Sequence, residues 1–207
     1  HETETTTTKT KINDHNTNTE QITIQALQAN VQTMADPAIH NQRQMHVPAS
    51  KQREWQKQAH EQGFHIAGIQ EARDKEQART TTDYYHTYTS KAKQAQQGCV
   101  QASQGGCQLL ITKVIIINKR EHTIQLHDTH IHYQDDTIII AELKTSKLHI
   151  NISVLHAPQS RIKGDNDNTI LDQWWTKTNQ LHNKHHNNDA ITILSLIHIS
   201  EPTRQVP

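Results

Sequence analysis

The chain has 207 residues, of which 32% are hydrophobic, 4% aromatic and 20% charged. An average soluble domain is about 45–50% apolar and about 25% charged, so this chain is unusually rich in uncharged polar residues. Its length suits one domain, or most of a larger one, and argues against two full domains. No stretch approaches the roughly 18 apolar residues that a membrane-spanning helix needs, so we expect no membrane span.

The charges balance, with 21 Lys and Arg against 21 Asp and Glu, so net charge does not indicate nucleic-acid binding by itself. The 17 histidines make the chain strongly cationic in mild acid and are potential metal ligands at neutral pH. Cys99 and Cys107 are too few for a disulfide framework or a zinc quartet. We expect two reduced thiols, with a single disulfide as the alternative.

The two ends of the chain differ from its middle. Residues 1–20 are mostly Thr, Asn, Lys and Glu without apolar periodicity, which predicts a disordered polar leader. Residues 194–204 read LSLIHISEPTR and resemble the translation of a sequencing-library adapter. We therefore assign residues 195–207 to a non-native, adapter-derived tail, with a genuine polar tail as the alternative. The remaining domain, residues 21–194, is expected to be incomplete at its C-terminus.

A strand, a helix and a second strand open the domain. Apolar and polar residues alternate from Ile22 towards Asn30, which predicts a strand. Residues 51–62 follow a serine at the N-cap position, carry two apolar residues four apart and precede Gly63, as a helix would. Residues 64–70 are mostly apolar, which is typical of a strand buried on both faces.

The rest of the domain is rich in predicted strands. A helix is predicted over residues 168–181, with Ile170, Trp174 and Leu181 on one stripe, and residues 182–189 form a polar loop. The sum is an α/β chain with few helices and many strands. A doubly wound nucleotide-binding fold fits poorly, because no Gly-rich turn follows the first strand. The predicted strands are residues 83–90, 107–118 (two apolar stretches), 137–143, 147–156 and the segment that starts at 190–194.

Polar side chains stand at the ends of three predicted strands. Glu71 directly follows a buried strand, and such a carboxylate suits a hard cation such as Mg²⁺, although an ion pair with Arg73 is the alternative. His156 precedes Ala157 and Pro158, which forbids a further ladder bond and leaves the imidazole at a strand-to-loop corner. With Asn30 these groups could hold a metal and stabilise a phosphate; an ordinary turn histidine is the alternative.

These residues lie in strings that occur in a recognisable order. LQANVQT surrounds Asn30, GIQEAR surrounds Glu71, GGCQLLI covers residues 105–111, and VLHAPQSR surrounds His156 before Trp174 and Trp175. The ordered set resembles the endonuclease/exonuclease/phosphatase superfamily. This group of metal-dependent phosphodiesterases includes DNase I, abasic-site endonucleases and the endonuclease domains of non-LTR retrotransposons. The resemblance covers residues 22–194.

The resemblance implies a DNase I-like α/β sandwich of two mixed or antiparallel sheets flanked by helices. It implies that Glu71 binds the catalytic Mg²⁺, with Mn²⁺ as a second suitable ion, and that Asn30 supports this site as a catalytic and metal-site residue. His156 would contact the scissile phosphate and take part in proton transfer, and Arg161 is a candidate phosphate contact. DNase I-like enzymes also pair this histidine with an acidic residue, for which three candidates stay open: Asp135, Asp136 and Glu142.

The chain departs from the family pattern after residues 191–194. The family continues there with a strand that ends in G-D-x-N, whose Asp and Asn orient the nucleophile and the leaving group, whereas adapter-like residues follow here. We therefore expect a fragment of a Mg²⁺-dependent endonuclease acting on DNA, nearly inactive as this chain. A retroelement-type enzyme would act in the nucleus. The chain begins with His1, so a signal peptide would lie upstream of it.

Three other functions remain open. A phosphatase acting on inositol lipid or another small phosphoester would belong to the same superfamily, and a neutral net charge does not oppose it. A non-enzymatic, His-rich metal-binding protein is suggested by His182, His185 and His186, although a solvated polar loop is the simpler interpretation of this cluster. A degenerate retroelement copy without activity is the third alternative.

Overall fold

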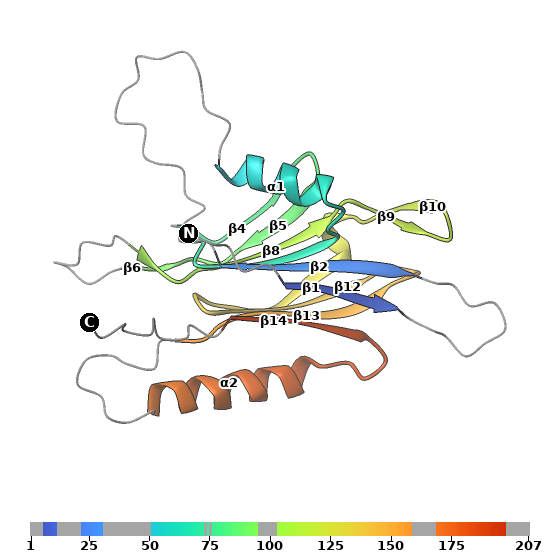
Figure 1. The fold of residues 1–207 in the computed structure, drawn as a ribbon. Helices are drawn as coiled ribbons and strands as arrows, with labels where there is room; N and C mark the ends of the chain where they lie inside the picture. The colour runs from blue at the N-terminus through green and yellow to red at the C-terminus, as the bar shows by residue number, and fades with distance from the viewer. Residues whose placement is uncertain are drawn as a thin grey trace, which may run out of the picture.

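The structure is a computed structural model of the chain and describes residues 6–11, 22–30, 51–72, 74, 76–94, 103–158 and 169–197. The described residues form mostly β-strands, with two α-helices. Two sheets lie against each other, with α1 on the outer side of one and α2 on the outer side of the other (Figure 1). In this part of the chain, neither helix has the length and apolar composition required to cross a bilayer.

The larger sheet has six strands in the order β1-β2-β3-β8-β5-β4. Its neighbours are antiparallel except β2 and β3, which run parallel. Helix α1, at Lys51–Glu61, lies between these two strands in the sequence, as a parallel pair requires a long crossover. The strands are β1 (Thr6–Lys11), β2 (Thr23–Asn30), β3 (Ile66–Gln70), β4 (Ala78–Thr81), β5 (Tyr85–Thr89) and β8 (Cys107–Thr112).

The smaller sheet has four strands in the order β11-β12-β13-β14. Only β13 and β14 are parallel, and helix α2, at Thr169–His185, lies between them in the sequence. The strands are β11 (Thr129–Gln134), β12 (Ile138–Lys144), β13 (His149–His156) and β14 (Ile191–Ile197). The connecting elements are two strand pairs, β6 (Lys93–Gln94) with β7 (Ser103–Gln104) and β9 (Val114–Ile117) with β10 (Arg120–Thr123), and a 3₁₀ turn, η1 (Leu126–Asp128).

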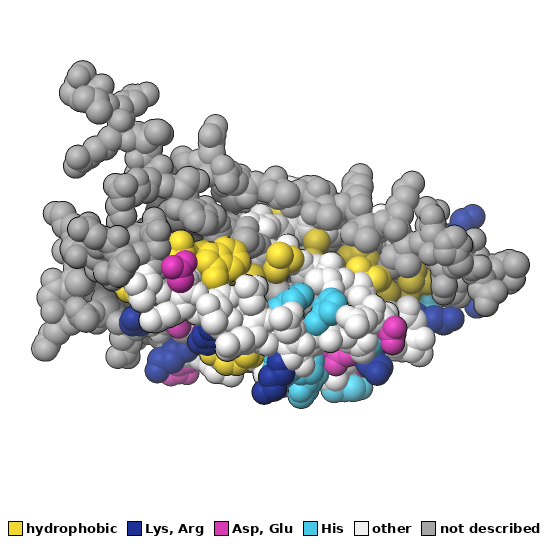
Figure 2. Space-filling model, turned by 90° about the horizontal axis from the view of Figure 1, so that it is seen from below, with side chains coloured by type: hydrophobic (Ala, Val, Ile, Leu, Met, Phe, Trp, Pro, Cys, Tyr) yellow, Lys and Arg dark blue, Asp and Glu magenta, His cyan; other side chains and the backbone are white. Residues whose placement is uncertain are grey.

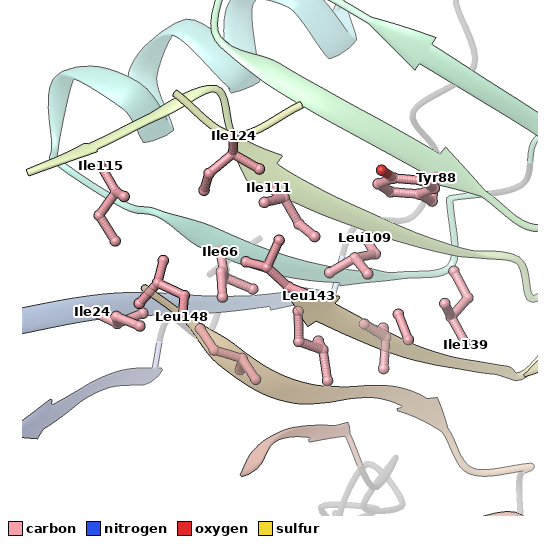
Figure 3. Packing of buried hydrophobic residues seen from close by; sticks show 14 of the residues in the cluster. Ile24, Ile66, Tyr88, Leu109, Ile111, Ile115, Ile124, Ile139, Leu143 and Leu148 are labelled. Atoms are coloured by element: carbon pink, nitrogen blue, oxygen red, sulfur yellow. The ribbon is translucent and has the colours of Figure 1, made fainter. Parts of the chain in front are cut away.

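The main hydrophobic core lies between the two sheets (Figure 3). Alternate residues of each strand point into it, because successive side chains of a strand face opposite sides of the sheet. From β3 and β8 come Ile66, Leu109 and Ile111, all at most 3% exposed. From the smaller sheet come Ile139, Ala141, Leu143, Ile150, Ile152 and Val154.

The outer faces of the sheets are covered by the helices. Helix α1 packs Ala59 and the partly buried Trp55 against Ala67, Ile69 and Leu110 on the larger sheet. Helix α2 buries Trp174 against the outer face of the smaller sheet. Its apolar partners there are Ile138, Ile140, Leu155 and Ala157. Strand β3 is therefore buried on both faces, as its unbroken apolar sequence predicts.

The mixed α/β composition predicted from the sequence is confirmed, and two packed sheets with helices outside are compatible with the predicted sandwich. The expectation of disorder throughout residues 1–20 is wrong, because Thr6–Lys11 forms β1 and pairs antiparallel with β2. Its Thr-rich sequence is not apolar, but β-branched residues suit a strand. Strands β4, β10 and β11 were not predicted, because their sequences are polar.

Two predicted boundaries also differ from the structure. Helix α2 continues to His185, so the predicted polar loop begins later than residue 182. The buried stripe of α2 also differs, because Leu171 packs on the sheet, whereas Ile170, which was predicted to lie on that stripe, is 41% exposed. Strand β14 continues to Ile197. Residues 195–197, which we assigned to the tail, therefore lie in the sheet beside β13. Residues 198–207 lie outside the described residues.

His65, just before β3, makes the fold sensitive to acid. Its Nδ1 accepts a hydrogen bond from the backbone N of Gln25 at 3.1 Å, and burial lowers the pKa of its imidazole. The unfolded chain then binds more protons, so stability falls as pH drops below about 6.5. We expect His65→Asn, which keeps an acceptor that does not bind a proton, to lose less stability between about pH 7 and about pH 5.5 in urea unfolding. If the free energy of unfolding of His65→Asn depends on pH as strongly as that of the wild type, His65 is not the source of the acid sensitivity.

Candidate functional site

Three strands from the two sheets end at one edge of the molecule. Strands β2 and β3 are parallel, and Asn30 at the end of β2 is in register with Gln70 at the end of β3. Glu71 is the next residue along the chain. Strand β13 ends at His156. His156 is the next alternate residue after Ile150, Ile152 and Val154, which face the larger sheet, so the His156 ring points towards β3.

Glu71 and His156 come together at this edge. The Oε1 atom of Glu71 lies 3.6 Å from the Nε2 atom of His156. Both side chains are largely buried, with 17% of Glu71 and 9% of His156 exposed. This distance is within the range of an ion pair but is longer than a hydrogen bond. Neither ring nitrogen of His156 has a hydrogen-bond partner among the described residues. A buried imidazole in this state is suited to a polar ligand.

The backbone of Glu71 is in an unusual conformation. Its φ angle is +57°, in the left-handed region that few residues other than glycine adopt. Such a conformation costs of order 1–3 kcal/mol and is found preferentially at functional sites. It persists here between strand β3 and Ala72, whose backbone N donates a hydrogen bond of 3.0 Å to the carbonyl of Gly106. The strained backbone of Glu71 therefore indicates that its side chain is held in a particular place for a function.

Gly105 and Gly106 allow the two sheets to approach each other beside His156. Gly105 has a φ angle of +72°, and a Cβ atom on it would lie 3.0 Å from the carbonyl oxygen of Asp136 and 4.0 Å from Nδ1 of His156. Gly106 donates its backbone N–H to the same carbonyl oxygen at 2.7 Å. A side chain at position 105 would crowd this contact, so the backbone itself forms this wall of the site.

The turn between β11 and β12 supports His156 from the other side. The backbone N of His156 donates to the carbonyl of Thr137 at 2.8 Å. Asp135 holds the turn, because its Oδ1 accepts from the backbone N of both Thr137 and Ile138 at 2.8 Å. Burial opposes ionisation of Asp135, but hydrogen bonds from Lys177, Thr137 and Tyr133 outweigh it and lower the pKa of this carboxyl.

The three acidic residues considered as partners of His156 have different positions. Asp135 is occupied by its turn and by Lys177 at 2.7 Å. Glu142 points to the outer face of the smaller sheet, where its two oxygens contact His149 and His132. Asp136 approaches the site through its backbone carbonyl. The carboxylate in contact with the His156 ring is that of Glu71, for which the sequence suggested a metal ion or Arg73 as the partner.

The other predicted residues are placed only in part. The backbone of Asn30 ends β2 next to Gln70, at the edge that carries Glu71, but its side chain lies outside the described residues. Arg161, Arg73 and Cys99 also lie outside them. Cys107 is a free, buried cysteine whose pKa is raised by burial and by Asp135 and Asp136, which makes its thiol unreactive.

A divalent ion would find few described ligands at this edge. Within the described ranges, no group of three or more His, Cys, Asp and Glu side chains is arranged to hold a metal ion. Mg²⁺ commonly uses only one or two carboxylates and takes its other ligands from water and substrate phosphate. Glu71 fits such a site, because 17% of its side chain is exposed and it lies beside His156, whose ring nitrogens have no hydrogen-bond partner among the described residues.

Comparison with known proteins adds no assignment. Neither a scan against models of known protein families nor a search of curated proteins finds a match to this chain.

Proposed function

We propose that the chain is part of a Mg²⁺-dependent phosphodiesterase with a DNase I-like fold, an endonuclease that hydrolyses DNA. The observation that carries the proposal is the contact of 3.6 Å between Glu71 and His156, two residues far apart in the sequence that end strands of different sheets. The resemblance requires these two residues to share one site. The order of the motifs and the two packed sheets with outer helices support the same proposal.

Each residue has a distinct task in this proposal. Glu71 would hold the metal ion, which supplies positive charge against the charge that develops on the phosphate. His156 offers an N–H donor to a phosphate oxygen, and its burial strengthens that interaction because little water competes. The backbone wall at Gly105 and Gly106 leaves room beside the imidazole. DNA as the substrate rests on the resemblance to endonucleases.

Replacing Glu71 tests the metal site. We expect Glu71→Gln to weaken Mn²⁺ binding, measured by electron paramagnetic resonance as a stand-in for Mg²⁺, by about ten-fold or more, since one charge-assisted contact is worth about 1.5–3 kcal/mol. Glu142→Gln is the matched control, because this glutamate also contacts histidine Nε2 atoms but lies on the outer face of the smaller sheet. Equal binding by the wild type and Glu71→Gln would contradict the proposal. Loss in Glu142→Gln alone would favour the His-rich metal-binding alternative.

Plasmid nicking tests the chemistry. No G-D-x-N follows residues 191–194, so we expect no Mg²⁺-dependent nicking above the metal-free rate from the 207-residue chain. Nicking that is abolished by Glu71→Gln would support the phosphodiesterase and show that the Asp and Asn of that motif are dispensable here. Nicking that persists in Glu71→Gln would contradict the assigned site.

A further inference from the structure

Six histidines gather between the C-terminal end of α2 and the outer face of the smaller sheet, on the side of the molecule opposite the larger sheet. We call them the histidine layer. Figure 2 faces α2 and shows histidine side chains grouped on this surface. Ring contacts join His132 to both His130 and His185, and join His182 to His186, while Glu142 contacts both His132 and His149. The members are His130 and His132 on β11, His149 on β13, His182 and His185 on α2, and His186 directly after it.

The rings are close enough to repel one another when protonated. His132 and His185 stack with their ring centroids 4.8 Å apart and so connect β11 to α2. His130 lies 4.7 Å from His132, and His182 lies 4.8 Å from His186. Neutral imidazoles pack favourably in this way, whereas two unit charges at 4.8 Å oppose each other by about 1 kcal/mol even in a water-like dielectric.

The layer has little negative charge to compensate protonation. Among the residues that the structure describes, Glu142 is the carboxylate in contact with it, at 3.4 Å from Nε2 of His132 and 2.5 Å from Nε2 of His149. These hydrogen bonds and charges lower the pKa of Glu142. The neighbouring Lys184 on α2 and Lys144, opposite His149 on β12, add positive charge. Asp189, on the turn after α2, is exposed.

The two halves of α2 are held differently. Its N-terminal half is attached by Trp174 and Leu171 in the apolar cluster on β12 and β13, and by Lys177 bound to Asp135 at 2.7 Å. Its C-terminal end meets the sheet through the histidine layer, through the partly buried Leu181 on the same apolar cluster, and through a hydrogen bond of 2.9 Å from Nδ2 of Asn151 to the carbonyl of Asn187. Burial, and then the neighbouring positive groups, lower the pKa of His182 and of His185. Acid therefore weakens the attachment, because the detached state binds protons more readily.

We propose that the histidine layer is a pH-sensitive contact: His182 and His185 hold the C-terminal end of α2 on the sheet as neutral imidazoles at neutral pH, and their protonation in mild acid releases it while the N-terminal half stays attached. Release would loosen residues 181–190, which comprise the last turn of α2 and its connection to β14. This inference is independent of the proposed phosphodiesterase, because the layer shares no residue with the Glu71 and His156 site.

Hydrogen exchange measured by mass spectrometry on the full chain tests the inference. We expect protection of residues 181–190, corrected for intrinsic exchange, to fall about five-fold or more from about pH 7.5 to about pH 5.5, the factor given by one like-charge pair at this separation. Residues 169–177 and strand β8 should keep their protection. Unchanged protection of residues 181–190, or an equal loss in β8, would overturn the proposal.

Histidine variants complete the test. The double variant His182→Gln/His185→Gln should remove the pH dependence of protection in residues 181–190, since glutamine stays neutral. His132→Gln changes the sheet side of the stacked pair His132–His185, so it should reduce this pH dependence without altering α2. His127→Gln is the matched control, because 83% of that side chain is exposed and it lies on η1. A full pH response in both the double variant and His132→Gln would overturn the proposal.

Discussion

Replacing Asp135 by alanine should lower the free energy of unfolding by about 3 kcal/mol, because several buried or half-buried donors lose their acceptor at once. The carboxylate accepts hydrogen bonds from two backbone N–H groups of the turn, from the hydroxyl of Tyr133 at 2.8 Å and from Lys177 at 2.7 Å. Urea unfolding at neutral pH measures the loss. The turn also positions Thr137 against His156, so the change should disturb the candidate site.

An exposed aspartate provides the comparison for Asp135. Asp83 contacts Arg53 at 3.0 Å, but 65% of its side chain and 70% of the arginine are exposed. Asp83→Ala should cost at most about 1 kcal/mol, as is usual for a solvated ion pair. Equal losses in the two variants would show that the Asp135 turn contributes no more than a surface contact.

The pH dependence gives a second measurement on Asp135. Its pKa is lowered in the folded state, so its contribution is present above the unfolded pKa of about 3.9 and is lost as pH falls through the lower folded value. The stability difference between the wild type and Asp135→Asn should therefore be constant near neutral pH and shrink only in stronger acid. A difference that disappears between about pH 7 and about pH 5 would instead indicate a histidine.

The sequence predicts those parts of the fold in which burial determines residue type. Strands β3, β8, β12 and β13 are apolar runs, and each was expected from its hydrophobicity. Strand β11 (THIHYQ) was not, because its outward residues His130 and His132 belong to the histidine layer and replace the apolar residues that a helix surface would favour. The end of α2 was missed for the same reason, since histidines there replace the apolar stripe.

The candidate site was predictable only in its strand-end residues. Glu71 and His156 could be expected at one edge because each follows or ends a buried strand. The roles of Asp135 and Gly105 at the site also depend on contacts between the β11–β12 turn and segments distant in the sequence, and a local pattern indicates only the turn itself. The Asp-x-Thr spacing of residues 135–137 is the available signal, since a short acidic side chain often accepts from the backbone two residues on.

Gly68→Ala should destabilise the chain by about 1–3 kcal/mol, the usual cost of overpacking a closely packed core. Gly68 faces β14 across the sandwich, and a Cβ on it would lie 2.4 Å from Oγ and 2.8 Å from Cβ of Ser195. Rotating the hydroxyl away would break its hydrogen bond of 3.0 Å from Nε2 of Gln70 and would leave the contact with Ser195 Cβ unrelieved. Urea or thermal unfolding measures the change.

A double-mutant cycle shows whether Gly68 and Ser195 are the interacting pair. Ser195→Gly removes both clashing atoms but leaves the buried Gln70 amide without this acceptor, so alone it should cost about 1 kcal/mol. In Gly68→Ala/Ser195→Gly the added methyl group occupies the vacated space, and the double variant should be more stable than the sum of the single changes predicts, by about 1 kcal/mol or more. Additive losses would mean that β14 does not face β3 at Ser195.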